Sequence, residues 1–399
     1  MSGSAASNVE HADLHAQATI ALLRPQSGAI TMQRDELESL LESLLPGTRI
    51  SRSTHLSELW AGYGHIYRLT LSPSPSRDAT YIVKTICPPP SARDEQDEGH
   101  LRKMLSYRIE ANFYRDFSAR LASPDDGCHI PTLHAASSSD HEAQTLVLED
   151  LAIRFPVLAE RRGTLNDAQL NKALEWLASF HARSWNTQSD SFCPPPLQAE
   201  TWSGRGLWQQ GGYHYLATRR DELSNIEPRS RWGQLGLHAH SDLPTVVDWC
   251  LNNPTDRSRL CLIHGDVKAA NMAFSRDTRH MAMYDFQYVG IGLGVQDLAK
   301  FLTTSIPSHH LARGGEEALL RTYHRALLDR LPAGAQYEFD DLMHDWQLAL
   351  VAWVRFLAGW SGGFWGNVDW LTSRVEAILT DPNWLHTIRQ RYHAHTQSQ

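Results

Sequence analysis

Several features that mark whole classes of protein are missing from this sequence. No apolar run is long enough to cross a bilayer, and residues 1–11 lack the basic and then apolar segments of a secretory signal. The five cysteines form no CxxC pair and no regular spacing, which excludes a disulfide framework and favours reduced thiols. We therefore expect a cytoplasmic protein that does not bind a membrane.

An excess of basic charge is also missing. The formal net charge is -8 and the isoelectric point is about 6.2, so a broad surface for nucleic-acid phosphates is not expected. Any anion would have to be bound by a few placed groups. With 399 residues, 42% hydrophobic and 21% charged, the chain is large enough for two domains or one large bilobal domain. Nothing in the sequence indicates an oligomeric state.

Hydrophobic periodicity divides the chain into a strand-rich front half and a helical rear half. Residues 1–33 show little periodicity and are predicted to form a flexible extension. In the front half we expect a helix over 35–45, two strands around a glycine turn over 59–71, a strand over 80–86, a helix over 101–121 and a strand over 146–148. In the rear half, helices dominate, and strands are expected only at 260–263, 272–274 and 281–284. The pattern predicts an α+β fold with two unequal parts.

Three polar residues in the rear half stand at strand ends and in the loop between them. Asp266 follows the strand that ends at Ile263, Asn271 comes five residues later, and Asp285 ends the next clear strand. Phosphoryl transfer needs such a set, because one carboxylate orients the attacking hydroxyl while an amide and a second carboxylate hold Mg²⁺. The structural alternative is that these are turn residues and a strand-end acid.

Further residues of the front half fit the same chemistry. Lys84 lies in a predicted strand, where a lysine can pair with the α- and β-phosphates of a nucleotide, and Glu110 lies on the following helix, where it can orient Lys84. Gly62 and Gly64 allow backbone amides to approach phosphates closely. Taken singly, each is a weak signal, since a strand lysine is usually a solvated surface residue. Their order along the chain is what makes them informative.

These motifs resemble the aminoglycoside phosphotransferase and choline kinase superfamily, and most closely its ecdysteroid-kinase-like branch. The matching segments are His264-Gly265-Asp266 with Asn271, Asp285-Phe286-Gln287, Leu146 to Leu151, Leu177 to Trp185 and Asp297 to Leu302. The resemblance runs from about Leu59 to beyond Trp360.

The resemblance implies a protein-kinase-like bilobal fold, with a small antiparallel β-sheet N-lobe and a mainly helical C-lobe. We expect residues 34–150 to form a nucleotide-binding N-lobe and residues 151–399 a catalytic and substrate-binding C-lobe. The implied cofactors are ATP and Mg²⁺, with adenine against the hinge backbone at Glu149, Asp150 and Leu151. Asp297 is implied to bond the backbone of the catalytic loop.

Lys268 departs from the family pattern, which has a bulky residue two positions after the aspartate. A cation there could stabilise charge on the transferring phosphoryl group, or the side chain could simply point to solvent. His264 is expected to brace the catalytic loop by hydrogen bonds.

Two other function classes fit less well. A protein kinase would need an activation segment, but Asp297 follows Asp285 by only twelve residues and no Ala-Pro-Glu motif closes the interval. A dinucleotide site at Gly290–Gly294 is rejected, because the third glycine is out of register for GxGxxG. A catalytically silent kinase fold that serves as a nucleotide-binding or scaffolding module remains the alternative to an enzyme.

The predicted phosphate acceptor is the hydroxyl group of a small molecule whose class stays open. Five tryptophans between Trp346 and Trp370 could hold a choline-like or aminoglycoside-like cation, or line a pocket for a flat apolar alcohol. Most of this stripe, from Leu342 to Trp360, has the helical spacing of a core face. Phe364 and Trp365 are the better candidates for substrate contact. Asp341 and Asp345 could balance a cation or cap a helix.

Overall fold

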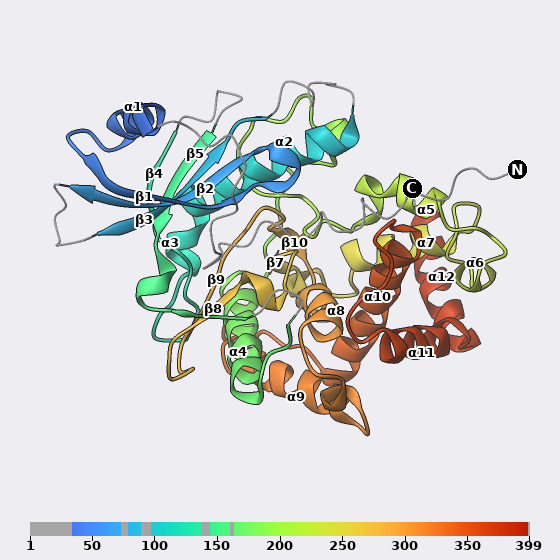
Figure 1. Cartoon of the computed structure of the whole chain (residues 1–399). Helices are drawn as coiled ribbons and strands as arrows, with labels where there is room; N and C mark the ends of the chain where they lie inside the picture. The colour runs from blue at the N-terminus through green and yellow to red at the C-terminus, as the bar shows by residue number, and fades with distance from the viewer. Residues whose placement is uncertain (1–33, 73–78, 89–96, 138–143, 160–162, 398–399) are drawn as a thin grey trace, which may run out of the picture.

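The front part of the molecule is a five-stranded antiparallel sheet with one long helix on its inner face. The computed structural model describes residues 34–72, 79–88, 97–137, 144–159 and 163–397 (Figure 1). The strands follow the order β1-β2-β3-β5-β4. The elements of this part are α1 (Arg34–Leu44), β1 (Arg49–Glu58), β2 (Gly64–Ser72), β3 (Thr80–Ile86), α2 (Glu98–Asn112), α3 (Ser118–Leu121), β4 (Leu133–Ala136) and β5 (Gln144–Glu149).

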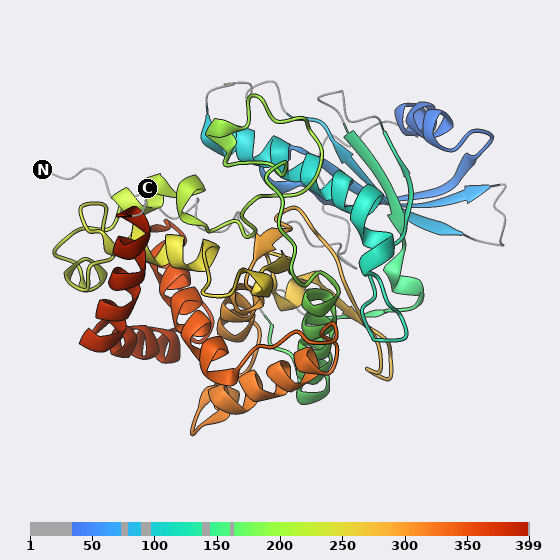
Figure 2. The ribbon, with the colours of Figure 1, turned by 180° about the vertical axis from the view of Figure 1, so that it is seen from behind.

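Both faces of this sheet are covered, and the alternation of side chains along β3 decides which residue faces which helix. Val83 packs with Leu37 and Leu41 of α1 on the outer face. Ile82 and Ile86 belong to the core on the inner face, towards α2, and strand geometry places Lys84 on that same side. The two coverings are visible from opposite directions in Figures 1 and 2. The period of the strand therefore directs Lys84 into the interior.

The rear part is built of helices around a small set of short strands. Its helices are α4 (Asp167–Arg183), α5 (Arg220–Ser224), α6 (Arg231–Gln234), α7 (Leu243–Asn252), α8 (Gly294–Thr304), α9 (Gly315–Leu328), α10 (Phe339–Gly359), α11 (Val368–Leu379) and α12 (Pro382–Thr396). Its strands are β6 (Val157–Leu158), β7 (Cys261–Ile263), β8 (Met272–Phe274), β9 (Met281–Met283) and β10 (Gly290–Gly292). The protein-kinase-like bilobal architecture expected from the sequence is confirmed.

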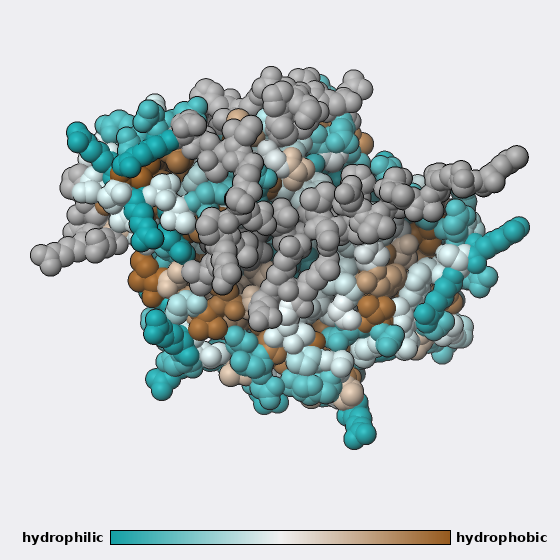
Figure 3. Space-filling view, in the orientation of Figure 1, coloured by the Kyte–Doolittle hydropathy of each residue, from teal (hydrophilic) through white to brown (hydrophobic). Residues whose placement is uncertain are grey.

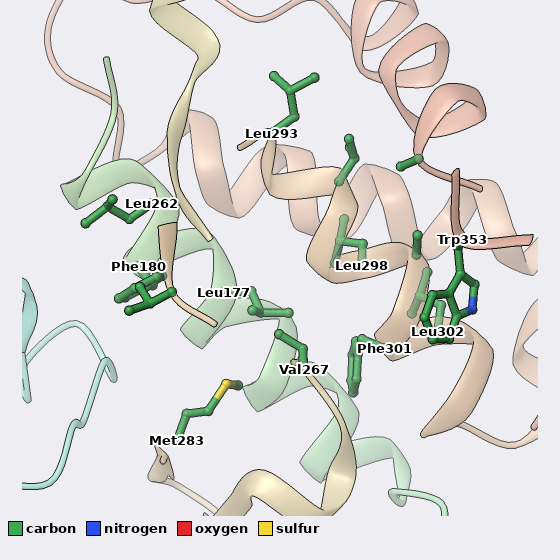
Figure 4. Close-up of a cluster of buried hydrophobic side chains, with 14 of the residues drawn as sticks. Leu177, Phe180, Leu262, Val267, Met283, Leu293, Leu298, Phe301, Leu302 and Trp353 are labelled. Atoms are coloured by element: carbon green, nitrogen blue, oxygen red, sulfur yellow. The ribbon is translucent and has the colours of Figure 1, made fainter. Parts of the chain in front are cut away.

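The apolar faces of α4 and α8 form the floor beneath the loop that carries Asp266. Leu177 and Phe180 of α4, Leu298 and Phe301 of α8, and Val267 of the loop converge in one buried cluster (Figure 4). Burying each such side chain contributes about 2 kcal/mol. The polar loop is therefore anchored by an apolar residue within it and held against two rigid helices.

Three details differ from the sequence-based expectations, and one expectation is not tested. The first strand is Arg49–Glu58, before the predicted range, and residues 60–62 form the glycine turn. The helix predicted over 101–121 is interrupted by a π-helical turn at Phe113–Phe117. Gly290–Gly292, which we did not expect as a strand, pairs with β7. The predicted extension 1–33 lies outside the described residues.

The surface gives no indication of a membrane-spanning element. No helix among the described residues combines the length and the apolar character that crossing a bilayer requires. On the face in Figure 3, hydrophobic residues form small separate patches among hydrophilic ones. Ile153 and Leu197 are exposed apolar side chains, and single ones are normal for a protein surface.

Candidate active site

The loop that follows β7 is held by two buried side chains. Both carboxylate oxygens of Asp297, on α8, accept backbone N–H groups, from His264 at 2.7 Å and from Gly265 at 2.8 Å. His264 in turn accepts the N–H of Asp266 on Nδ1 at 3.2 Å, and its Nε2 donates to the carbonyl of Tyr284 at 3.0 Å. The contacts expected for Asp297 and His264 are therefore present. They fix the direction in which Asp266 leaves the loop.

Asp266 is a buried carboxylate between two ammonium groups. Lys268 pairs with its Oδ2 at 2.9 Å, and Lys300 of α8 pairs with its Oδ1. The Lys268 side chain is 23% exposed, whereas that of Lys300 is 4% exposed. From the sequence alone, Lys268 could have been a catalytic or a solvent-facing residue; in the structure its ammonium group contacts Asp266. Lys300 was not identified from the sequence.

These cations control the ionisation of Asp266. Burial alone would raise the pKa of Asp266, but the neighbouring Lys268 and Lys300 outweigh it and hold that pKa well below the usual range. Burial lowers the pKa of Lys300, and the charge of Asp266 offsets only part of this effect. Asp266 is thus a permanently ionised carboxylate at any physiological pH.

Asn271 and Asp285 each have a buried oxygen that accepts no hydrogen bond from the described part of the chain. The Asn271 side-chain amide donates to the backbone carbonyl of Asp266 at 3.0 Å, which leaves Asn271 Oδ1 buried without a hydrogen bond among the described residues. Asp285 Oδ1 is likewise buried without a hydrogen bond, although Lys84 Nζ lies 3.5 Å away. Asp285 also has a positive φ of 70°, which is uncommon outside glycine. Buried unsatisfied oxygens of an amide and a carboxylate suit a hard cation such as Mg²⁺.

Lys84 and Glu110 form the ion pair expected between the sheet and α2. Lys84 Nζ lies 2.6 Å from Glu110 Oε2, and both side chains are buried. Burial by itself would lower the pKa of Lys84, but Glu110 and Asp285 raise it above its ordinary value. The charged lysine is therefore held beside the unsatisfied oxygen of Asp285.

Gly62, in the turn between β1 and β2, and Gly64, the first residue of β2, have different roles. Gly64 has a φ of 148°, and a side chain there would collide with the carbonyl of Thr85, so strand packing requires a glycine. Gly62 has a φ of 74° and open space around it, but its N–H already donates to Leu59 at 3.1 Å. Contact of this turn with a phosphate stays a prediction.

The segment predicted as the hinge is firmly tied to the sheet. The Asp150 carboxylate accepts hydrogen bonds from Arg68 at 2.7 Å and from Thr80 at 2.9 Å. Glu149 donates its N–H to Thr132 at 2.9 Å, and Leu151 is buried in a small apolar cluster. Their side chains thus have structural contacts, and adenine binding to this backbone stays a prediction.

A cavity of about 360 Å³ opens beside Asp266 and Asp285. Its described lining combines aromatic rings with basic groups from both parts of the molecule. The lining residues are Trp60, Arg102, Lys103, Tyr107, Gly163, Tyr213, Arg219, Asp266, Lys268, Ala269, Ala270, Asp285, Gln287, Tyr288, Lys300, Thr304, Ser305, Trp360, Gly362, Phe364, Trp365 and Gly366. A cavity of this size is large enough to hold a small organic molecule.

The tryptophan-rich segment divides between core and cavity. Trp346 and Trp353 of α10 are fully buried, as expected for a core face. Trp360, which we had counted in the same stripe, follows the last residue of α10 and lines the cavity with Phe364 and Trp365. The suggestion that Phe364 and Trp365 contact substrate is compatible with this position.

Asp341 and Asp345 do not reach the cavity. Asp341 pairs with Arg259 at 2.5 Å, and buried Asp345 accepts a hydrogen bond from Tyr337 at 2.8 Å. Neither belongs to the described lining. The idea that they balance a cationic acceptor is therefore not supported, because their carboxylates are used within the helical part.

The sequence of this chain matches the model of a known protein family. The model of the ecdysteroid kinase-like family matches residues 63–333, which is more than half of the chain. The chain belongs to the ecdysteroid kinase-like family. The matched range includes Lys84 and Glu110 as well as the loop of Asp266, and it ends within the helical part. Among proteins with curated functions, no sequence matches this family member.

Solved structures similar to this ecdysteroid kinase-like protein are phosphotransferases of low sequence identity. An amicoumacin kinase, hAmiN, in complex with AMP-PNP, Ca²⁺ and Ami, is 12% identical over 84% of this chain and 91% of its own, with a TM-score of 0.43. An aminoglycoside-3'-phosphotransferase of type VIII is 17% identical over 80% and 98%, with a TM-score of 0.41. A putative aminoglycoside phosphotransferase from Ralstonia eutropha JMP134 is 12% identical over 90% and 98%, with a TM-score of 0.43. At these values the likeness says nothing about substrate.

Proposed function

We propose that this protein transfers the γ-phosphate of ATP to a hydroxyl group of a small molecule. The observation that carries the proposal is that Asp266 and Asp285 line one cavity, with Asn271 bonded to Asp266 and the Lys84–Glu110 pair beside Asp285. A silent kinase fold has no need to keep a buried amide oxygen of Asn271 and a buried carboxylate oxygen of Asp285 without hydrogen bonds, because unpaired buried polar groups are costly.

Each group has a part in the proposed reaction. Lys84 binds nucleotide phosphates, and Asn271 and Asp285 would hold Mg²⁺ through their unsatisfied oxygens. A bound magnesium ion would neutralise part of the negative charge of the phosphates. Asp266 aligns the acceptor hydroxyl, and Lys268 balances negative charge on the transferring group.

The two parts of the chain have different functions in the proposed reaction. We assign nucleotide binding to an N-lobe of residues 34–150, with the backbone of 149–151 and the turn at 62–64 as further contacts. Acceptor binding belongs to a C-lobe of residues 151–399. Cysteines without a disulfide pattern favour the cytoplasm as the place of action.

The test is ADP formation with ATP and Mg²⁺, first without an acceptor and then with a panel of alcohols. Asp266→Asn is expected to lower turnover by at least about a thousandfold, because orientation of the hydroxyl is lost. Its affinity for AMP-PNP, measured by calorimetry, should stay within about threefold of the wild type. Asp190→Asn, on an exposed loop, is the matched control and should be fully active. Wild-type turnover in Asp266→Asn would refute the assignment.

A further inference from the structure

The described lining of the cavity is unusually basic for a site that would accept a cationic substrate. It contains five basic residues and only two acidic ones, Asp266 and Asp285. Asp266 is already paired with two lysines, and Asp285, 3.5 Å from Lys84 Nζ, is assigned to Mg²⁺ in the proposed function. No carboxylate of the described lining is left to pair with an ammonium group. An anionic or neutral acceptor therefore fits the charge of the cavity, and an aminoglycoside-like or choline-like one does not.

Two of the basic residues come from opposite parts of the molecule and meet at one end of the cavity. Arg102, on α2, donates to the carbonyl and the hydroxyl oxygen of Thr218 at 2.8 and 2.9 Å. The next residue, Arg219, donates to the carbonyl of Tyr213 at 2.7 Å and pairs with Glu222 at 3.0 Å. Only one carboxylate, that of Glu222, therefore serves the two guanidinium groups within ion-pairing distance in the described part of the chain.

The electrostatics of this pair indicate a missing negative charge. Arg219 is 5% exposed, and no described carboxylate lies within 4.0 Å of Arg102. Burial lowers the pKa of Arg102, and the adjacent charge of Arg219 lowers it further. Arg219 is buried and Arg102 is partly buried, and two such like charges are costly unless an anion neutralises them; guanidinium groups suit carboxylate and phosphoryl oxygens.

This arginine pair is separated from the nucleotide contacts. Arg102 precedes Glu110 by eight residues on α2, which is about 12 Å along a helix, so Arg102 is distant from the Lys84–Glu110 pair. Towards Asp266, the ring of Tyr213 intervenes. Lys300 Nζ lies 4.2 Å from the centre of that ring, and the Arg219 guanidinium lies 5.6 Å from it. Tyr288 adds a second ring, 5.5 Å from that of Tyr213.

We propose that the phosphate acceptor of this protein carries an anionic group, a carboxylate or a phosphoryl group, which Arg102 and Arg219 bind. Its hydroxyl group lies at Asp266, and a flat apolar middle packs on Tyr213. The inference rests on the proposed function. It adds a substrate class and a second role for α2, because Arg102 would connect the acceptor to the lobe that binds the nucleotide.

The test uses four compounds that share a ring and a primary alcohol and differ in charge. They are 4-(hydroxymethyl)benzoate, 4-(hydroxymethyl)phenylphosphonate, 4-(hydroxymethyl)benzamide and 4-(hydroxymethyl)benzylamine. Binding is measured by calorimetry on the full chain with AMP-PNP and Mg²⁺ present. We expect at least one anion to bind about tenfold more tightly than the amide, and the amine to bind more weakly than the amide. The two anions distinguish a carboxylate from a phosphoryl group.

Two variants assign the preference to the arginine pair. Arg102→Gln keeps a hydrogen-bond donor for Thr218 but should remove the preference for the anion over the amide. Arg220→Gln, at an exposed position next to Arg219, should retain the preference. The inference is overturned if neither anion binds better than the amide up to about 10 mM, or if Arg102→Gln keeps the full preference. Binding of AMP-PNP alone is measured first, so that a failure of the proposed function is recognised separately.

Discussion

Replacing Asp266 by alanine should cost stability as well as activity, because of what the replacement leaves behind. Lys300 is 4% exposed at its side chain, and Asp266 is its only ion-pair partner within 4.0 Å among the described residues. Lys268 keeps access to solvent, with 23% of its side chain exposed. The variant therefore contains one buried ammonium group without a counter-charge. Removing one partner of a buried pair typically costs about 3–5 kcal/mol.

The destabilisation of the Asp266→Ala variant has an upper limit that depends on pH. The folded variant can release the proton of Lys300, and for a lysine with an ordinary pKa of about 10.4 this costs about 4.6 kcal/mol at pH 7 and about 1.9 kcal/mol at pH 9. Burial already lowers the pKa of Lys300, and loss of Asp266 lowers it further. At pH values between the folded-state pKa and the unfolded-state pKa of Lys300, the unfolded chain binds more protons than the folded chain. The stability of the variant relative to the wild type therefore rises with pH, by up to about 1.4 kcal/mol per unit.

Equilibrium urea unfolding at pH 7 and pH 9 measures this effect. The double variant Asp266→Ala/Lys300→Met should recover at least half of the lost stability at pH 7, since no buried charge remains, and it should stay inactive. Lys268→Met, which removes the more exposed cation, is the control and should lose about 1 kcal/mol or less. A loss that is the same at both pH values, or a double variant no more stable than the single one, would refute the reasoning.

Three further outcomes are expected. Gly64→Ala should destabilise the protein by about 2–3 kcal/mol because its side chain meets the carbonyl of Thr85, whereas Gly62→Ala, with open space, should cost about 1 kcal/mol; thermal unfolding compares the two. Glu110→Gln should raise the dissociation constant of AMP-PNP about tenfold by calorimetry, since Lys84 loses its closest carboxylate; an unchanged constant would contradict the role of the pair. Asp297→Asn should lower turnover at least about tenfold at unchanged nucleotide affinity, because one backbone N–H loses its acceptor.

Local pattern accounts for the parts of the fold that the sequence predicted. β3 was assigned correctly over residues 80–86 because it is rich in β-forming residues along its whole length. β1 was misplaced because it is an edge strand in which only Ile50 and Leu56 are buried, so most of its residues are polar or half-exposed. β10 was missed because glycine is rare in strands. Here a side chain at Gly290 would collide with Trp208, a contact between segments far apart in sequence.

The residues of the candidate site also divide into those with a local sequence signal and those that only the fold brings together. Asp266, Asn271 and Asp285 were predicted from their local spacing, and Lys84 was predicted from its order relative to them along the chain. Residues such as Arg102 and Arg219 lie in unrelated segments that the fold brings together, and no spacing rule connects them. Lys300 did leave a signal: it follows Asp297 by three residues and therefore lies on the same face of α8, between the buried Leu298 and Phe301. A charged side chain at a buried helical position needs a partner of opposite charge.

The two lysines beside Asp266 also determine what that carboxylate can contribute to the proposed phosphoryl transfer. A carboxylate whose pKa is held far below its usual range is a weak proton acceptor, so general-base catalysis gains little from it. Phosphoryl transfer tolerates this, because its loose transition state asks for positioning and charge balance more than for early proton removal. Asp266 is therefore best placed to orient the hydroxyl, and the proton has to leave late, when the new bond to phosphorus has made the oxygen acidic. On this reasoning Lys268 and Lys300 make Asp266 a weaker base. In return they place positive charge next to the phosphoryl group, where negative charge must be stabilised.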